Sequence, residues 1–205
     1  MKAKKSENKR KKIEEILIKV GIEIARKGGG ALFIISDSCK YKRLLKQKIK
    51  PFSIFEKGAE KILMSIGTID GAVIVNSKGM IKDYGAFIKS KKIFKGFGTR
   101  HIAAYNASLN KDTIAILVSE EEKKVKIFKE GKIILQFDTL EKNIQKNVNE
   151  TFKLLESLGF GTLSSVSIST LIPGLGVSIF PGIILFAAPY YIFRKIQEKR
   201  KTKKF

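Results

Sequence analysis

Three short and strongly apolar segments place the tightest limit on how this chain can fold. They are ALFIIS (31–36), GAVIVN (71–76) and TIAILVS (113–119), each bounded by glycine or polar residues. Apolar runs of about four to eight residues between turn signals are typical of buried strands, whereas helices are longer. We therefore expect these three segments to lie in the interior of a sheet.

Amphipathic segments of helical spacing separate these strands. Residues 13–26 place Ile13, Ile16, Leu17, Val20 and Ile24 on one face, and the segment ends at three glycines. We expect two further helices, over residues 55–67 and over TRHIAAYNASLN (99–110).

Two predicted hairpins complete the pattern of elements. One covers residues 71–89 and turns at Ser77-Lys78-Gly79, and the other covers residues 124–137 and turns at Glu130-Gly131. Helical crossovers together with hairpins predict an α/β fold with a mixed central sheet, both parallel and antiparallel, flanked by helices.

The composition divides the chain into five parts. We expect a basic tail (1–11), a compact domain (12–137), a connecting amphipathic helix capped by Asp138 (138–158), an apolar helical segment (159–193) and a second basic tail (194–205). The only cysteine is Cys39, so the chain has neither an internal disulfide nor a cysteine-rich zinc site.

No charged residue and no histidine occurs from 157 to 193. A transmembrane helix needs about 20 apolar residues, but glycines and prolines interrupt this stretch. We expect a membrane-associated segment over 159–193, as one kinked helix or a re-entrant hairpin, with the preceding domain in the cytoplasm and the basic terminus as its anchor. The alternative is a glycine-rich helical pair buried in a homo-oligomer interface.

The formal net charge of +22 suits an anionic membrane surface, a nucleic acid or a generally lysine-rich surface. Seven of the first twelve and seven of the last twelve residues are basic. This loading of the ends favours a membrane surface or basic tails, and it argues against a nucleic-acid-binding groove.

Three polar segments could carry chemistry, although each also has an ordinary explanation. Asp70-Gly71 precedes a strand, but such pairs are usually turns. Gly98-Thr99-Arg100-His101 opens a helix and could hold phosphate, but threonine is also a common N-cap. Ser119-Glu120-Glu121 ends a strand, where solvated acids are common.

In combination, these segments are much more specific than any one of them alone. DGAVIV, then GTRHIAA about 30 residues later, then a strand ending in VSEE, resembles the diadenylate cyclase domain over residues 12–137. The resemblance implies a fold of that type and the conversion of two ATP molecules into cyclic di-AMP and two pyrophosphates. It also implies a divalent metal, Mn²⁺ or Mg²⁺, and at least a transient homodimer, which could enlarge to a higher homo-oligomer.

The resemblance also implies roles for individual residues. The implied catalytic residues are Asp70, Arg100 and His101, and the implied metal ligands are Asp70, Glu120 and Glu121. The implied ATP-binding residues are Gly71, Ala72, Phe87, Gly98, Thr99, Arg100, His101 and Ser119. Phe87 would pack against adenine, or it would serve only as a packing residue.

Two positions depart from the family pattern. Ile102 stands where the family motif RHR has its second arginine, and Ile69 stands where members of the membrane-linked branch often have histidine. We expect an active cyclase. The alternative is a catalytically weak or inactive module that only binds nucleotide.

Overall fold

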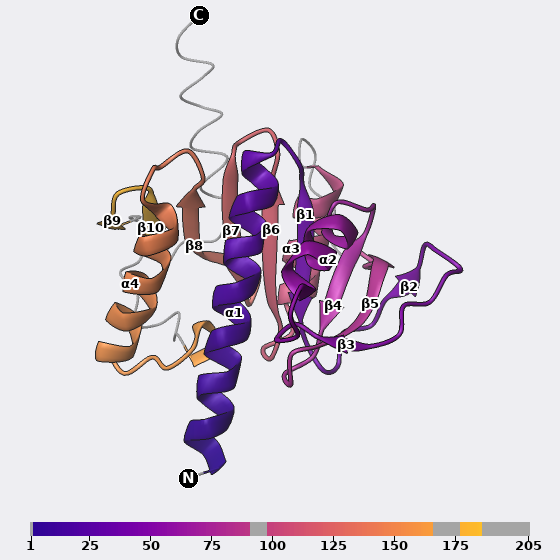
Figure 1. Cartoon of the computed structure of the whole chain (residues 1–205), viewed down its shortest axis with the longest axis horizontal. Coiled ribbons are helices and arrows are strands. Elements are labelled where there is room, and N and C mark those ends of the chain that lie inside the picture. Colours follow the sequence, from indigo (N-terminus) through magenta and orange to yellow (C-terminus); the bar gives the residue numbers. More distant parts are fainter. Residues whose placement is uncertain (1, 91–97, 166–176, 186–205) are drawn as a thin grey trace, which may run out of the picture.

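The computed structural model describes residues 2–90, 98–165 and 177–185. Within these ranges, the helices are α1 (Lys2–Arg26), α2 (Ala59–Gly67), α3 (Thr99–Ser108) and α4 (Ile144–Ser157), with a short 3₁₀ turn at Leu163–Ser165 (Figure 1). The strands are β1 (Ala31–Ile35), β2 (Lys42–Arg43), β3 (Phe52–Ser53), β4 (Ala72–Val75), β5 (Met80–Phe87), β6 (Ile114–Ser119), β7 (Lys124–Lys129), β8 (Lys132–Asp138), β9 (Val177–Phe180) and β10 (Ile183–Leu185).

The described strands form one mixed sheet in the order β2-β5-β4-β1-β6-β7-β8-β10-β9, and β3 also pairs with β5. Strand β1 runs parallel to β4, with Phe33 opposite Val73, and antiparallel to β6, with Phe33 opposite Ile116. The other pairs among these strands are antiparallel. The expected mixed α/β sheet, the three buried strands and both hairpins are therefore confirmed.

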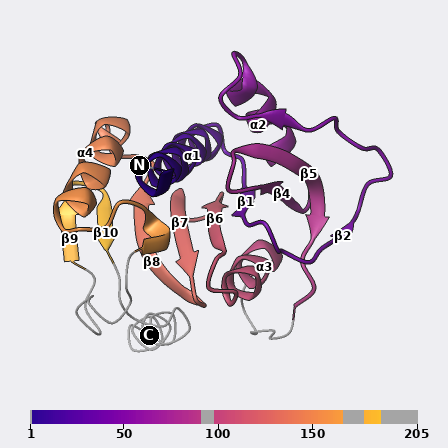
Figure 2. The ribbon, with the colours of Figure 1, turned by 90° about the horizontal axis from the view of Figure 1, so that it is seen from below.

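The sheet buries both of its faces. Helices α1, α2 and α4 lie on one face and α3 lies on the other (Figure 2). Alternate residues of β1 separate accordingly: Phe33 and Ile35 belong to the core under α1, whereas Leu32 and Ile34 belong to the core under α3. Because successive side chains of a strand point to opposite faces, a run such as ALFII suits a strand that is covered on both sides.

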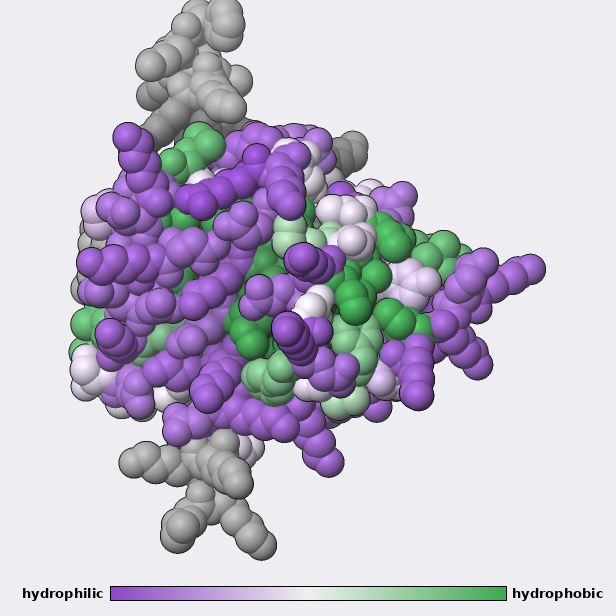
Figure 3. Space-filling model, in the orientation of Figure 1, coloured by the Kyte–Doolittle hydropathy of each residue, from purple (hydrophilic) through white to green (hydrophobic). Residues whose placement is uncertain are grey.

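Helix α1 begins at Lys2, so the expectation of a separate basic tail over residues 1–11 is wrong for residues 2–11. Contacts with distant parts of the chain hold this part of the helix. The Lys11 ammonium lies 2.7 Å from a carboxylate oxygen of Glu156, and Arg10 donates to the carbonyl of Asp112 at 3.0 Å. Arg10 and Lys11 are half-buried by these contacts, and the face over α1 and α4 is largely hydrophilic (Figure 3).

The expected connecting helix begins later than predicted and belongs to the core. Asp138 is the last residue of β8 rather than a helix cap, and the N-cap of α4 is Asn143. Helix α4 buries Val148, Phe152 and Leu155 in the same cluster as α1. It is therefore part of the globular unit and not a linker.

The expected helical segment over 159–193 contains a hairpin instead. Strands β9 and β10 extend the sheet beyond β8, with Ile183 buried opposite Phe137. Gly182 forms the turn with φ of +77°, a conformation that glycine adopts without strain. Residues 166–176 and 186–193 of the predicted segment lie outside the described residues. No described helix is both long enough and apolar enough to cross a bilayer, and membrane association stays a prediction.

Gly71 is predicted to be a strong determinant of stability. Its φ is +100°, and a Cβ atom there would lie 2.6 Å from the carbonyl carbon of Gly85. Gly71→Ala should therefore lower the free energy of unfolding by about 2 kcal/mol or more, because backbone strain and a steric clash add.

Gly58→Ala is the matched control for this effect. Gly58 has φ of +86°, but no atom lies within 4 Å of the position that a Cβ would take, so only the strain of about 1 kcal/mol should remain. Denaturant unfolding of the two variants measures the difference. Equal losses in the free energy of unfolding would show that the contact with Gly85 does not contribute to the effect of Gly71→Ala.

Candidate active site

The candidate site lies at the N-terminus of α3, where the segment Gly98-Thr99-Arg100-His101 begins the helix. Gly98 is the N-cap, with an extended conformation, and Thr99 is the first helical residue, so threonine is not the cap that its composition suggested. The first turn contains no acidic residue. Its amides and the helix dipole therefore produce a positive potential that favours an anion.

Two pockets adjoin this helix start and share Thr99 and Arg100. The first is polar, has a volume of about 370 Å³ and includes His101, Ser119 and the acids 120–122 in its lining. The second is mainly apolar, has a volume of about 450 Å³ and is lined in part by Leu32, Phe87 and Ile102. A polar compartment thus meets an apolar one at Thr99 and Arg100.

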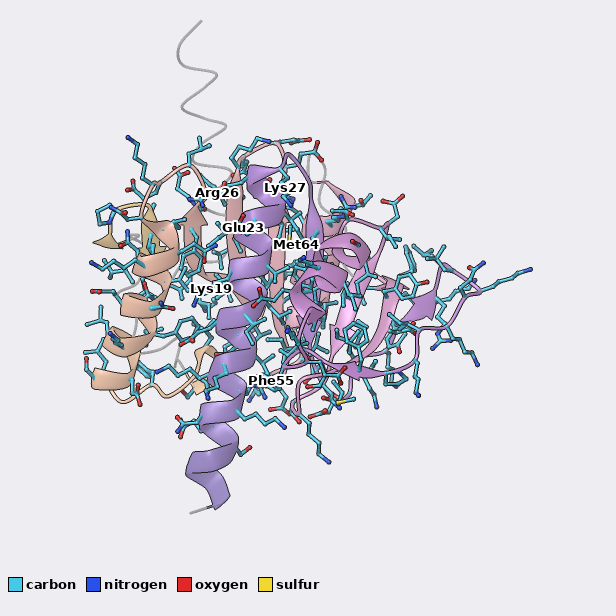
Figure 4. All side chains as sticks on the ribbon, in the orientation of Figure 1. Lys19, Glu23, Arg26, Lys27, Phe55 and Met64 are labelled. Atoms are coloured by element: carbon cyan, nitrogen blue, oxygen red, sulfur yellow. The ribbon has the colours of Figure 1, made fainter. Side chains whose placement is uncertain are left out.

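A third and larger cavity of about 540 Å³ lies between α1 and α2, on the sheet face opposite α3. Lys27 and Met64, which Figure 4 labels, are part of its lining. None of the residues predicted for the site lines it. The hydroxyls of Ser65 and Thr68 there already donate to carbonyls one turn earlier in the chain. Size alone therefore does not identify the functional site.

Asp70 contacts Arg100, whose side chain lines both pockets. An Arg100 Nη atom lies 3.4 Å from a carboxylate oxygen of Asp70, whose side chain is 95% exposed. Gly30 makes room for this arginine, because a Cβ at Gly30 would lie 3.0 Å from the other guanidinium Nη. An exposed ion pair contributes little to stability, so both groups are available for a ligand at low energetic cost.

The predicted site residues fall into four groups in the structure. Gly98, Thr99, Arg100, His101, Ser119, Glu120 and Glu121 line the polar pocket, and Gly71 and Phe87 line the apolar one. Asp70 meets Arg100 at the rim. Ala72 is 1% exposed and packs in the core under α3, and it is not among the lining residues of either pocket.

Gly71 has a structural explanation that the motif did not reveal. The resemblance implied an ATP-binding role for this glycine, which does line the apolar pocket. The space in front of its Cα is filled by the backbone of Gly85 and Ala86 on the neighbouring strand. The glycine therefore permits close approach of β4 and β5 beside the apolar pocket, which Phe87 also lines.

Glu122 and Lys126 adjoin His101 and were missed from the sequence. The Lys126 ammonium lies 2.6 Å from a carboxylate oxygen of Glu122 and 3.4 Å from Nε2 of His101. In its protonated form the His101 ring, together with the Lys126 ammonium, holds the pKa of Glu122 at about 2, although partial burial opposes this shift. Glu122 directly follows Ser119-Glu120-Glu121, but only the fold places Lys126 beside His101.

Comparison with known proteins identifies the family of the chain. Residues 21–133 match the family model described as "DisA bacterial checkpoint controller nucleotide-binding", abbreviated DAC. The match covers more than half of the 205 residues. The chain therefore belongs to this family, the diadenylate cyclase family.

Two curated relatives are named diadenylate cyclase. The protein from Methanocaldococcus jannaschii is 33% identical over 146 residues, which are 64% of this chain and 47% of the relative. The protein from Haloferax volcanii is 30% identical over 141 residues, which are 60% of this chain and 51% of the relative. The chain thus spans about half the length of the curated relatives that it matches.

Solved structures give weaker similarities. A double mutant of DacA from Staphylococcus aureus matches with a TM-score of 0.45 and 21% identity, over 71% of this chain and 94% of that one. A hypothetical membrane spanning protein from Bacillus cereus matches with a TM-score of 0.45 and 20% identity, over 60% and 62% of the two chains. Neither similarity is close enough to support an argument about this chain.

The low pKa of Glu122 predicts a specific pH dependence of stability. Its folded-state pKa of about 2 lies below the ordinary value of 4.5, so its ionised form stabilises the fold above pH 4.5. That stabilisation should be lost as the pH falls from 4.5 toward 2. Urea unfolding of the wild type and Glu122→Gln between pH 2 and 6 measures it. The difference between the two proteins should shrink on acidification, and a difference independent of pH would contradict the assignment.

Proposed function

We propose that this chain is a diadenylate cyclase that joins two ATP molecules into cyclic di-AMP and releases two pyrophosphates. The observation that carries this proposal is the polar pocket and the apolar pocket that meet at Thr99 and Arg100. ATP has the same two parts, an anionic triphosphate and a flat base. Family membership and the names of the two curated relatives support this assignment.

The polar pocket suits the triphosphate. Arg100 can form two parallel hydrogen bonds to phosphate oxygens, and the first turn of α3 adds the helix dipole. Thr99 is exposed and can donate its hydroxyl, and His101 lines the same pocket. The apolar pocket suits adenine, with Phe87 at the end of β5 half-exposed and available for stacking.

The reaction requires two equivalent phosphoryl transfers. In each, the 3′-hydroxyl oxygen of one ATP bonds to the α-phosphorus of the other, the bond from that phosphorus to pyrophosphate breaks, and the hydroxyl proton leaves. Negative charge grows on the α-phosphoryl oxygens and on the pyrophosphate. Arg100 and the N-terminus of α3 would stabilise this charge, and Asp70 would orient the attacking hydroxyl and accept its proton.

We further propose that Asp70 and one of Glu120 or Glu121 hold a divalent cation, Mn²⁺ or Mg²⁺, jointly with the substrate. Among the described residues, no three acidic, histidine or cysteine side chains are grouped as a metal site. Magnesium is usually held by one or two carboxylates together with substrate phosphates, so this donor set fits. When bound, the cation would neutralise phosphate charge.

Ring closure needs two ATP molecules, whereas the two pockets of one chain accommodate one nucleotide. Two protomers that face each other would place each 3′-hydroxyl near the other α-phosphate, and two-fold symmetry would make both attacks equivalent. The exposure of Asp70 at the pocket mouth supports this arrangement, because its carboxylate can reach a substrate held by a partner.

A nucleotide-binding module without turnover is the second candidate function. Ile102 favours it, since an apolar side chain lines the base pocket where the family motif has arginine. We favour the enzyme because Asp70 and Arg100 are both present and in contact.

Asp70→Asn should abolish cyclic di-AMP formation and retain ATP binding. Loss of the carboxylate should lower the rate by about 100-fold or more, the usual weight of a group that transfers a proton. The assay is product formation from ATP with Mn²⁺, alongside ATP binding by calorimetry. Asp112→Asn is the control, because Asp112 is exposed at the opposite end of β6. Full turnover by Asp70→Asn would exclude the proposed role, and binding without turnover by the wild type would favour the module.

Phe87→Ala should weaken ATP binding about tenfold, because stacking of a base on an aromatic ring contributes about 1–3 kcal/mol. Phe55→Ala is the control: Phe55 is similarly exposed but lies beside Lys9 of α1 (Figure 4), and it is not among the lining residues of either pocket. The dissociation constant for ATP is the quantity to measure. If both variants bind as the wild type does, Phe87 has only a packing role.

A further inference from the structure

Lys126 is a buried cation directly behind His101. It lies on β7, its side chain is 3% exposed, and Ile127 after it points to the opposite face of the sheet, toward α1. Burying an ammonium is costly unless it is paired and hydrogen-bonded. Glu122 provides the pairing at 2.6 Å, and the His101 ring adds a contact at 3.4 Å.

The distances among the three side chains indicate which ring nitrogen of His101 carries the proton. Glu122 Oε1 lies 2.6 Å from the lysine nitrogen but 3.7 Å from Nε2 of His101, so the carboxylate is bound mainly to the ammonium. An ammonium has three donors and no acceptor. The imidazole Nε2 can therefore bond to Lys126 only through its lone pair.

We propose that Lys126, held by Glu122, is a positioning residue that fixes His101 in the tautomer with its proton on Nδ1. This inference rests on the proposed function, in which the polar pocket holds a triphosphate. Nδ1 lies on the Gly98 side of the ring, 3.8 Å from where a Cβ of Gly98 would be. Gly98 and His101 both line the polar pocket. The Nδ1–H group is then the donor that His101 presents to a phosphate oxygen.

His101 is the only histidine of the chain, so the tautomer can be read directly. Nitrogen NMR of protein labelled with ¹⁵N-histidine should show a protonated Nδ1 and an unprotonated Nε2 at pH 8. In Lys126→Met, which removes the ammonium but keeps the side-chain volume, the two signals should change toward the other tautomer. A wild-type Nε2–H signal, or an unchanged spectrum in Lys126→Met, would overturn the proposal.

Lys129→Met is the matched control. Lys129 is another buried lysine of β7, 5% exposed, but it lies near Arg10 and Glu14 on the α1 side of the sheet. Its removal should leave the His101 signals unchanged. If Lys126→Met fails to fold because Glu122 is left without its cation, the double variant Glu122→Gln with Lys126→Met removes both charges and tests the same prediction.

Activity provides the second measurement. Lys126→Met should lower kcat/KM for pyrophosphate release about tenfold, the usual effect of losing a charge-assisted hydrogen bond. Lys129→Met should stay within twofold of the wild type. A change of tautomer with unaltered kcat/KM would exclude a role in the reaction. If the wild type releases no pyrophosphate, the proposed function fails while the NMR test remains, and the dissociation constant for ATP replaces kcat/KM.

Discussion

The pairing of β1 with β4 on one side and β6 on the other is the contact on which the site depends. Strand β1 is parallel to β4 and antiparallel to β6, so the starts of β1 and β4 lie at the same end of the strands as the end of β6. Gly30, Asp70 and Ser119, which are far apart in the sequence, therefore lie together at this end of the central strands. Helix α3 packs against β1, β6 and β7, and its first residues line the polar pocket together with Gly30 and Ser119. The pockets are thus a consequence of strand order.

Burial of β1 on both faces makes this arrangement robust. Its five residues are all buried, and they alternate between the core under α1 and the core under α3. A shift of register by one residue would exchange the two sets of side chains and disturb both cores. The hydrophobic cores therefore hold Gly30, Asp70 and Ser119 in place, although Asp70 itself is exposed.

The sequence predicted best what depends on local pattern. The strands at 31–35, 72–75 and 114–119 and the helix start at Thr99 follow from apolar runs and glycine boundaries. The first turns of α1 could not be predicted in this way, because Arg10 and Lys11 bind partners 102 and 145 residues away. The hairpin at 177–185 was likewise predicted as helix, because the length of the uncharged stretch suggested a membrane-associated helix. Its pairing with β8 is a tertiary contact that the local sequence does not reveal.

The candidate site was also predicted only in part, because local motifs do not show which distant residues the fold brings together. Ordered motifs identified Asp70, Arg100 and His101, and the structure places all three at one corner. The same motifs gave Gly71 a role beside the nucleotide, and it does line the apolar pocket, but they did not reveal that its missing Cβ makes room for Gly85. Lys126 appeared to be one lysine of an alternating strand. Only the fold shows that it is buried beside His101.

The most direct test of the central claim is a product balance for the full chain. With ATP and Mn²⁺, cyclisation predicts one pyrophosphate for each ATP consumed and one cyclic di-AMP for every two. ADP, inorganic phosphate and AMP should not accumulate. Chromatography of nucleotides together with an enzymatic pyrophosphate assay measures both ratios in one reaction. Release of ADP and phosphate, or no consumption of ATP at any divalent cation tested, would contradict the assignment of the paired pockets to a diadenylate cyclase.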